Sequence, residues 1–591
     1  MKNPLSIFIS SLSIYGKYVA ARLLLLSLAG LWFAGSSTIA MASIPAPKPT
    51  ANPELLAHQK RLEEPKIVKL TEHVYAGMNY DLANIGVVIT DQGILVYDVF
   101  GEVDRAEQFL TDLRKISKAP IIGVVYSHAH GDHVGGVRAF IPEHSEQDIP
   151  IYAHEKYSRY MREMTIPRGM IRGYMQMGYL LPKNIEGSVG AGAGKAVGSG
   201  RFSFLEPTVI VKDKLTIDVG GIAVELFYAP GDLDDGLAAW IPSEGVLMAG
   251  DSAYPMMPII ATPRFEHGRR PWEAIDTVDL YRQLPIEHLI GGHIGNVSGQ
   301  ENVYKFLTKF RDAIQFLHDQ TIRAANKGMD HDEAAQWVIA TLPKDIKDDP
   351  NFTAHYQNLE WIIKGLYTKA VGWWNGDVVN LVKITWIEKA QHTIDLAGGR
   401  KNMHNAMEAA FNKGQTAWAM ELANMLFQTD NDDQQARTAL INLMRTVAYQ
   451  SHTSNQRHYL LSQALILEGH INVAQLPLNK TNPDFLRAVD ANTLFRSLGP
   501  KISIEKAANL HLTLHILLSD KNNDHSLFIR RGVIEHRNGK PEAIDLTFTT
   551  DSETWNLLVG RHLDWATAIK EKQLTVKGEQ SKLNSFIDLF E

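Results

Sequence analysis

The stretch PIIGVVYSHAHGDH at residues 120–133 decides the fold of this chain. Its apolar first part, residues 120–125, predicts a short buried strand. Polar side chains follow where that strand ends, namely His128, His130, Asp132 and His133. Imidazole nitrogens and carboxylate oxygens bind zinc or a similar divalent ion, and the chain has no cysteine that could take their place. These four possible ligands are more than a single tetrahedral ion with one open position would need. The motif therefore predicts a site for two metal ions.

A histidine-rich surface loop is the alternative interpretation, and an isolated His-x-His pair would favour it. Here the full order His-x-His-x-Asp-His is present, it follows a strand, and Gly135 and Gly136 come just after it. Clustered ligands at the end of a strand are the structural context that such a motif requires. We therefore favour the metal site over the surface loop.

The order of these residues resembles that of the metallo-β-lactamase superfamily. In that superfamily, two later strand ends carry the third ligand of the first metal and the bridging carboxylate, and a later loop carries the last ligand. The resemblance implies Asp232, Asp251 and His293 for these three positions. Asp234 and Asp235 compete with Asp232 for the third ligand, and Asp232 is preferred only because it directly follows a Pro-Gly pair.

Strand and helix patterns around the motif indicate the fold class. Residues 85–90 and 94–99 are largely apolar and flank a turn at 91–93, which predicts a hairpin. Residues 104–115 then predict a helix that leads into the strand before the motif. Hairpins mixed with helix-linked strands indicate an α/β sandwich with its sheets inside and its helices outside. The resemblance implies that this is the metallo-β-lactamase αββα sandwich.

A long insertion at residues 155–200 interrupts this pattern. It holds arginine and aromatic side chains and ends in a glycine-rich run at 187–195. One interpretation is a flexible surface excursion. The other is a lid, in which arginines and glycine N–H groups receive an anion while Met, Tyr and Leu side chains face an apolar tail. The sequence leaves both interpretations open.

The length of 591 residues requires several domains, because a single core does not grow to this size. Beyond residue 300 the pattern is helical, and from about residue 476 it returns to mixed strands and helices, with strands at 526–535 and 543–549 and a helix at 552–559. We expect a catalytic domain at 43–325, an all-α domain at 326–470 and a small α+β domain at 476–591. The net charge of −7 does not favour a nucleic-acid partner.

The N-terminus predicts a signal peptide at residues 1–42. Lys2, Lys17 and Arg22 precede an apolar run at 23–34, and Ala40 and Ala42 supply the small residues of a cleavage site. An uncleaved membrane anchor is the alternative, but the apolar run is shorter than the roughly 20 residues that a membrane span needs. We expect an exported protein, periplasmic or secreted, without stable membrane insertion after cleavage.

The mature chain resembles, along essentially its whole length, the alkylsulfatases of the metallo-β-lactamase superfamily. These enzymes combine a binuclear zinc domain, a helical dimerisation domain and a C-terminal domain like sterol carrier protein type 2. The sequences LHDQT at 317–321 and VGWWNG at 371–376 resemble the dimerisation domain, and the glycine-rich loop at 187–194 and the order of the domains agree with it. The resemblance implies a homodimer.

The resemblance also implies two Zn²⁺ ions per chain and assigns the residues that hold them. One ion would be bound by His128, His130 and Asp232, and the other by Asp132, His133 and His293, with Asp251 between the two. Arg264 stands where the family places an arginine that binds the sulfate. The resemblance thus implies two residues that act in catalysis, Asp132 and Arg264. The chain departs from the family in one respect, because the sulfatases carry Glu at the positions of Asp232 and Asp251.

The implied activity is the metal-dependent hydrolysis of alkyl sulfate esters, which are amphipathic small molecules, to an alcohol and inorganic sulfate. A metal-activated hydroxide would attack, while Arg264 and the glycine-rich loop would stabilise the leaving sulfate. One alternative is another hydrolase of the superfamily, acting on a lactam, lactone, thioester or phosphodiester, which the two Asp ligands favour. A second is a periplasmic lipid-binding protein with a structural metal site, against which the number of ligands argues, because structural sites usually hold one four-coordinate ion.

Overall fold

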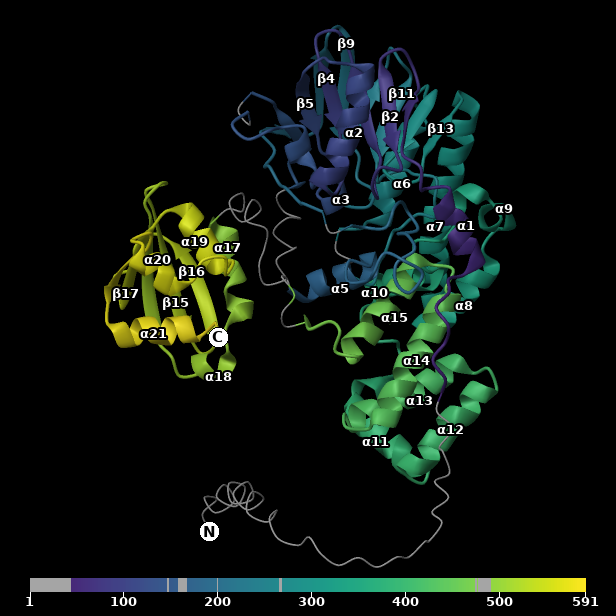
Figure 1. Ribbon diagram of the computed structural model, residues 1–591, viewed down its shortest axis with the longest axis vertical. Coiled ribbons are helices and arrows are strands. Elements are labelled where there is room, and N and C mark those ends of the chain that lie inside the picture. Colours follow the sequence, from purple (N-terminus) through teal and green to yellow (C-terminus); the bar gives the residue numbers. More distant parts are fainter. Residues whose placement is uncertain are drawn as a thin grey trace, which may run out of the picture. The chain divides into compact units, whose positions relative to one another are not determined.

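The computed structural model describes residues 44–145, 148–157, 167–198, 200–264, 268–473, 476 and 491–590. The signal peptide predicted at 1–42 lies outside these residues. Figure 1 follows the chain from two β-sheets, coloured purple to teal, through a series of helices in teal and green to a small sheet in yellow. Within the described ranges, no helix combines the length and the apolar character that crossing a membrane requires.

The first part of the chain forms two sheets. One has seven strands in the order β1-β2-β3-β4-β5-β6-β7, and the other has six in the order β13-β12-β11-β10-β9-β8. The strands of the first are β1 (Lys66–Lys69), β2 (Val74–Met78), β3 (Ile85–Ile89), β4 (Ile94–Tyr97), β5 (Ile121–Val125), β6 (Ile151–His154) and β7 (Val209–Val211). The strands of the second are β8 (Lys214–Val219), β9 (Ile222–Tyr228), β10 (Leu237–Ile241), β11 (Val246–Gly250), β12 (His288–Gly291) and β13 (Asn296–Ser298). β3 and β4 pair antiparallel with Ile89 opposite Ile94, which confirms the predicted hairpin.

The two sheets face each other across a shared apolar core. Val88 of β3 lies in one buried cluster with Leu226 of β9 and Met248 of β11. Side chains alternate along a strand, so Val87 points to the opposite face, where it lies in a second buried cluster with Phe109 of helix α2 (Val103–Ile116). Helices α6 (Pro271–Tyr281) and α7 (Gln300–Asn326) cover the outer face of the second sheet in the same way. This order of layers confirms the predicted αββα sandwich.

The glycine-rich part of the insertion is buried rather than exposed. Gly187, Ser188 and residues 190–194 are all buried. The His58 Nε2 atom, on helix α1 (Pro53–Lys60), lies 2.7 Å from the carbonyl oxygen of Gly192. This part of the insertion is therefore not a surface excursion. The arginines predicted to line a lid at 159 and 162 lie outside the described residues.

Three consecutive residues of helix α15 (Ser454–Leu467) hold the insertion in place, and we call them the α15 clasp: Arg457, His458 and Tyr459. Arg457 donates to the carbonyl oxygens of Gly187 at 2.8 Å and Ile185 at 2.6 Å, and also to Thr50 near the start of the described chain at 2.8 Å. His458 Nδ1 lies 3.0 Å from the carbonyl of Gln176, the buried penultimate residue of helix α5 (Pro167–Met177). The Tyr459 hydroxyl donates to the side chain of the same glutamine at 3.2 Å.

Acid is expected to weaken the packing around the clasp. Burial lowers the pKa of His458 to about 3 and that of His58 to about 4. Both rings stay neutral in the folded protein, whereas the unfolded chain takes up protons below pH 6.5, so stability is complete above pH 6.5 and falls as the pH drops towards 4. Each histidine should remove about 1.4 kcal/mol per pH unit in this window. Melting temperatures of the metal-free protein at pH 7 and pH 5 measure the effect. The variant His458→Asn keeps a hydrogen-bond donor but cannot titrate, so its melting temperature should fall less between the two pH values than that of the wild type. An equal fall in both proteins would contradict the role of His458.

The next region is helical, as predicted. After α7 it contains α8 (His331–Thr341), α9 (Lys344–Lys347), α10 (Leu359–Val371), α11 (Trp386–Leu396), α12 (Arg400–Asn412), α13 (Thr416–Thr429), α14 (Gln434–Gln450) and α15. α8 and α11 begin with complete capping boxes, in which Asp330 and Thr385 bond reciprocally with a glutamate three residues later. Leu317 of α7 and Ile363 of α10 lie in one buried cluster with residues of the second sheet. The apolar core is therefore continuous across residue 325, where the sequence predicted a domain boundary.

The last region is a small α+β unit. Its sheet has the order β16-β15-β14-β17-β18, with β14 (Leu512–Leu518), β15 (Asn523–Arg530), β16 (Val533–Asn538), β17 (Leu546–Thr550) and β18 (Thr575–Gly578). Its helices are α17 (Ala491–Ser497), α18 (Ile504–Ala507), α19 (Ser552–Val559), α20 (Trp565–Lys570) and α21 (Gln580–Asp588). The prediction of one strand at 526–535 is wrong, because the chain turns at Arg531 (φ 51°) and Gly532 (φ 74°). Two consecutive residues with positive φ angles form the tight hairpin turn that matches the twist of the strands. Such turns usually begin with Asn, Asp or Gly, so the arginine at the first position did not indicate a turn in the sequence.

Candidate metal centre

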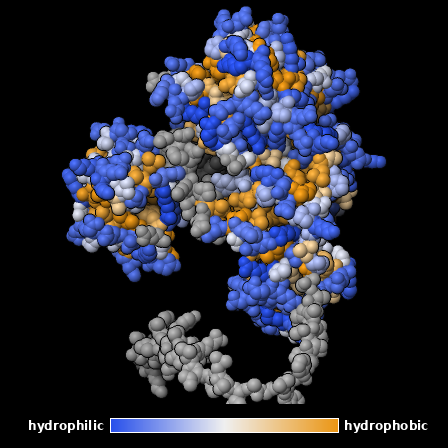
Figure 2. Space-filling view, in the orientation of Figure 1, coloured by the Kyte–Doolittle hydropathy of each residue, from blue (hydrophilic) through white to orange (hydrophobic). Residues whose placement is uncertain are grey.

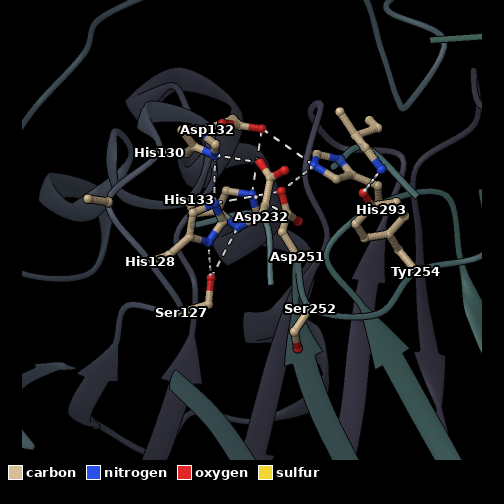
Figure 3. Close-up of polar contacts among 12 residues, drawn as sticks. Ser127, His128, His130, Asp132, His133, Asp232, Asp251, Ser252, Tyr254 and His293 are labelled. Carbon is tan, nitrogen blue, oxygen red and sulfur yellow. Dashed lines mark hydrogen bonds and ion pairs between the residues drawn. The ribbon is translucent and has the colours of Figure 1, made fainter. Parts of the chain in front are cut away.

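Strand ends from both sheets meet at one edge of the sandwich. β5 ends at Val125 and is followed by the motif loop and the short helix α3 (Gly131–Val134), which carries Asp132 and His133. In the second sheet, β11 ends directly before Asp251, and its parallel neighbour β12 ends shortly before His293. Parallel strands present their carboxyl ends at the same edge, where sites of α/β proteins form. Figure 3 shows the side chains of these segments converging there.

A first group of possible ligands forms around the His-x-His pair. It consists of His128, His130, Asp232 and Asp251, all buried, each offering an atom within 4.8 Å of the others. His130 Nδ1 lies 3.2 Å from Asp232 Oδ2, and His128 Nε2 lies 3.6 Å from Asp251 Oδ2. Two imidazoles and two carboxylates at this spacing can surround one divalent ion.

A second group lies beside the first and contains Asp132, His133 and His293. His133 Nε2 is 3.6 Å from Asp132 Oδ2, and His293 Nε2 is 3.7 Å from the same oxygen. Asp251 also reaches this group, because its Oδ1 lies 3.4 Å from His133 and its Oδ2 lies 3.2 Å from His293. Asp251 therefore stands between the two groups. The structure brings together all seven residues that the resemblance names, in the same two sets, while their role as ligands stays a prediction.

Of the three aspartates that compete for the third position, Asp232 is the one that enters the cluster. Asp235 instead accepts a hydrogen bond from the Ala129 N–H at 2.9 Å, which fixes the backbone between His128 and His130. Asp234 faces Arg270, with 3.7 Å between its Oδ2 and the guanidinium. Asp232 is held in its loop by Thr277, whose hydroxyl donates to the carbonyl of Pro230 at 2.7 Å.

The residues of the cluster fit a divalent cation. His133 Nε2 and Asp251 Oδ1 are buried, and neither makes a hydrogen bond to any described residue. Such a buried polar atom without a partner costs about 1–3 kcal/mol. A cation between the imidazole nitrogen and the carboxylate oxygen would satisfy both atoms at once.

The electrostatics of the cluster favour the ligand forms of His128, His130 and Asp251. Burial lowers the pKa of His128 and of His130 well below the ordinary value, so both rings are neutral and keep a free nitrogen lone pair. Burial alone would raise the pKa of Asp251, but His293 and His133 beside it hold that pKa well below its usual range. The carboxylate between the two groups is therefore ionised. Burial alone would lower the pKa of His133 and of His293, but Asp251 beside them raises both pKa values, so a bound ion would have to displace their protons.

Residues outside the cluster orient its histidines. Asp98 is buried and accepts from His133 Nδ1 at 2.7 Å, from the Ser127 N–H at 2.8 Å and from the Ser127 hydroxyl at 2.9 Å. His293 Nδ1 lies 3.0 Å from the carbonyl of Leu82. Each of these contacts leaves the Nε2 atom facing the cluster, which is the usual arrangement behind metal-bound histidines.

Sequence reasoning did not find Asp98 or Arg269. Asp98 interrupts the apolar run from Ile94 to Phe100, and a carboxylate inside such a run was a usable signal. Arg269 is buried and forms an ion pair with Asp232. The sequence around Arg269 did not indicate that this side chain would be buried, because the preceding stretch has no regular pattern of apolar residues. Arg264, which was predicted, is partly buried and its charge acts on both His130 and Tyr459, so it lies on the side of the cluster that faces the clasp.

Three family matches cover most of the chain in order. Residues 79–293 match the metallo-beta-lactamase superfamily, residues 331–470 match the alkyl sulfatase dimerisation family, and residues 479–591 match the alkyl sulfatase C-terminal family. The first match contains every residue of the cluster. The other two follow at the positions of the helical region and of the small α+β unit.

Several characterised proteins are similar over nearly the full length. A linear primary-alkylsulfatase of Pseudomonas sp. (strain ATCC 19151) is 28% identical over 519 residues, which is 85% of this chain and 97% of that protein. An (R)-specific secondary-alkylsulfatase of Pseudomonas sp. is 26% identical over 563 residues, 92% of this chain and 83% of that protein. The solved structure of the stereoselective inverting sec-alkylsulfatase Pisa1 from Pseudomonas sp. superposes with a TM-score of 0.83 at 24% identity, covering 92% of this chain and 87% of that one. The order of sandwich, helical region and small α+β unit is thus shared over 92% of this chain.

Proposed function

Because the chain belongs to the alkylsulfatase family of the metallo-β-lactamase superfamily, we propose that it hydrolyses alkyl sulfate esters to an alcohol and inorganic sulfate. The observation that carries the proposal is the position of Asp251, which lies within 3.6 Å of His128, His133 and His293 and so joins two groups of ligands. A structural metal site would need only one such group. The names of the relatives supply the substrate class.

We propose zinc as the metal, because the cluster offers only imidazole and carboxylate ligands. Two such ions, when bound, would polarise the ester and lower the pKa of a water molecule. The chain's own residues then have separate tasks. His128 and His130 supply neutral nitrogens, Asp98 keeps His133 turned towards the cluster, and Arg264 adds a positive charge where an anionic head group would enter.

The test of this proposal is sulfate release from sodium dodecyl sulfate by the purified, zinc-loaded protein without residues 1–42. We expect release by the wild type and none above background by His130→Ala. His288→Ala is the matched control, because His288 bonds Ser298 at 2.9 Å on the neighbouring strand and lies outside the cluster. A protein with both metal positions filled but without sulfate release would contradict the alkylsulfatase proposal and point to another ester or a lactam, the alternative that Asp at positions 232 and 251 favours.

We propose that the protein is a homodimer assembled through the segment 371–387 of the helical region. Apolar side chains in this segment are largely exposed, including Trp373 (78%), Val379 (71%) and Val382 (86%). Figure 2 shows hydrophobic surface around α10, the helix that leads into this segment. Monomeric proteins rarely expose apolar side chains so close together, and the segment lies inside the match to the alkyl sulfatase dimerisation family.

Val382→Asp is expected to convert the dimer into a monomer. An unpaired charge buried in an interface costs about 3–5 kcal/mol, which raises the dissociation constant at least about 100-fold. Light scattering of the purified protein measures the molar mass. Val533→Asp introduces the same change at an exposed position of the small α+β unit and should leave the mass unchanged. A monomeric wild type would contradict the proposal.

We further propose that residues 1–42 direct export and are removed, so that the protein works in the periplasm or outside the cell. Support comes from the basic start, the apolar run and the small residues near position 42. N-terminal sequencing of protein recovered from the periplasm tests this, and a chain that keeps its first residues in the cytoplasm would contradict it.

A further inference from the structure

Arg269 is a buried cation that shares one carboxylate with the metal cluster. Only 4% of the residue is exposed. Its Nη1 forms an ion pair with Asp232 Oδ1 and also donates to the carbonyl oxygen of Ile259. The other oxygen of Asp232, Oδ2, faces His130 at 3.2 Å. The two oxygens of Asp232 therefore point to different partners, one to the guanidinium and one to the cluster.

This division affects how Asp232 can bind an ion. A buried guanidinium is costly unless it is paired, because each ion loses several kcal/mol of hydration. Asp232 Oδ1 provides such a pairing, so rotating the carboxylate to offer both oxygens to an ion would break this ion pair. The ion pair thus favours binding of an ion through Oδ2.

Among the described residues, three hydrogen bonds fasten the segment that carries Arg269 to the helical region. The Met257 N–H donates to the carbonyl of Thr353 at 3.2 Å, and the Gln357 side chain donates to the carbonyl of Ala261 at 2.6 Å. In the third of these bonds, Lys369 on the last turn of α10 donates to the carbonyl of Arg269 itself. The position of the guanidinium beside Asp232 therefore depends on α10.

We propose that Arg269 is the positioning residue that holds Asp232 in its metal-binding orientation, and that the helical region sets the place of Arg269 through Lys369. This inference rests on the proposed metal centre. It gives the helical region a role in the metal site in addition to assembly.

Zinc affinity, measured by competition with a chelator, tests the proposal by the direction of its change. If Arg269 acted only as a charge, its removal would tighten the binding of a cation. If it positions Asp232, Arg269→Met should weaken zinc binding about 10–100-fold, as losses of such supporting contacts do. Arg269→Lys keeps the charge but not the fork of donors, and should recover only part of the affinity. Lys369→Met should show a smaller loss in the same direction.

Arg270→Met is the matched control, because Arg270 is exposed and pairs with Glu273 at 2.8 Å rather than with the cluster. The melting temperature of each metal-free variant checks that it folds. Unchanged or tighter zinc binding by Arg269→Met would overturn the proposal, and so would full zinc loading with a raised KM, which would make Arg269 a substrate contact. A wild type that binds no zinc would instead refute the metal centre, so the two failures are distinguishable.

Discussion

Asp251→Asn is expected to lower the rate of sulfate release about a thousandfold. Asp251 is the carboxylate shared by both groups of ligands, with 3.2 Å to His293 and 3.4 Å to His133. An amide of the same shape carries no charge, so it would hold neither ion firmly. Loss of the metal's contribution to the transition state costs several kcal/mol, and about 4 kcal/mol corresponds to this factor.

The experiment compares kcat/KM and bound zinc for the wild type, Asp251→Asn and Asp234→Asn. Asp234→Asn is the control, because it makes the same substitution at an aspartate whose carboxylate faces Arg270 rather than the cluster. The control should retain its zinc and stay within roughly threefold of the wild-type rate, a change of less than about 1 kcal/mol. If Asp251→Asn kept more than a tenth of the wild-type activity, the central position of Asp251 would have no catalytic meaning.

Arg457→Met is expected to destabilise the packing of the insertion by at least about 3 kcal/mol. Arg457 is fully buried, and its guanidinium bonds three backbone carbonyls, those of Thr50, Ile185 and Gly187. Burial also lowers the pKa of Arg457 to about 10, which leaves it charged at neutral pH. Methionine fills much of the same space but donates nothing, so each carbonyl loses its partner at about 1–3 kcal/mol.

Hydrogen exchange of the backbone amides at 187–194 gives a local readout of this change. A loss of 3 kcal/mol should speed their exchange by roughly 100-fold when exchange follows local opening. Arg445→Met is the control, because Arg445 pairs with the side chain of Glu468 at 2.6 Å rather than with carbonyl oxygens of the insertion. Equal exchange rates in Arg457→Met and the wild type would show that the clasp does not hold the insertion.

Four of the seven residues of the cluster were predictable from a local pattern, because His128, His130, Asp132 and His133 stand in one short stretch. The hairpin of the sandwich was predictable for a similar reason, because two apolar runs on either side of a tight turn specify β3 and β4 without information from elsewhere. In both cases the deciding pattern spans only a few residues. The other three residues of the cluster, Asp232, Asp251 and His293, came from the resemblance to the metallo-β-lactamase superfamily, which places ligands after two later strands and on a later loop.

The supporting residues were harder to predict because their partners are distant in sequence. Asp98 meets His133 only after β4 and β5 pair in parallel, and its own backbone has a positive φ of 64° that its position in an apolar run does not suggest. Arg457 bonds backbone carbonyls more than 250 residues away, and a carbonyl has no signature in a sequence. Asp232 could not be separated from Asp234 and Asp235 for the same reason, since only the fold decides which of them faces His130.

The α15 clasp has a consequence for the order in which the protein can become active during its synthesis. The whole metal cluster precedes residue 294, but Arg457, His458 and Tyr459 are made much later. At ribosomal speeds the chain needs roughly 10–30 s to extend from the last cluster residue to the clasp. Until then the insertion beside the cluster lacks the partners that bury it. The hydrolase therefore stays incomplete until the clasp residues have been made, and a fragment limited to the two sheets would lack the support of its own insertion.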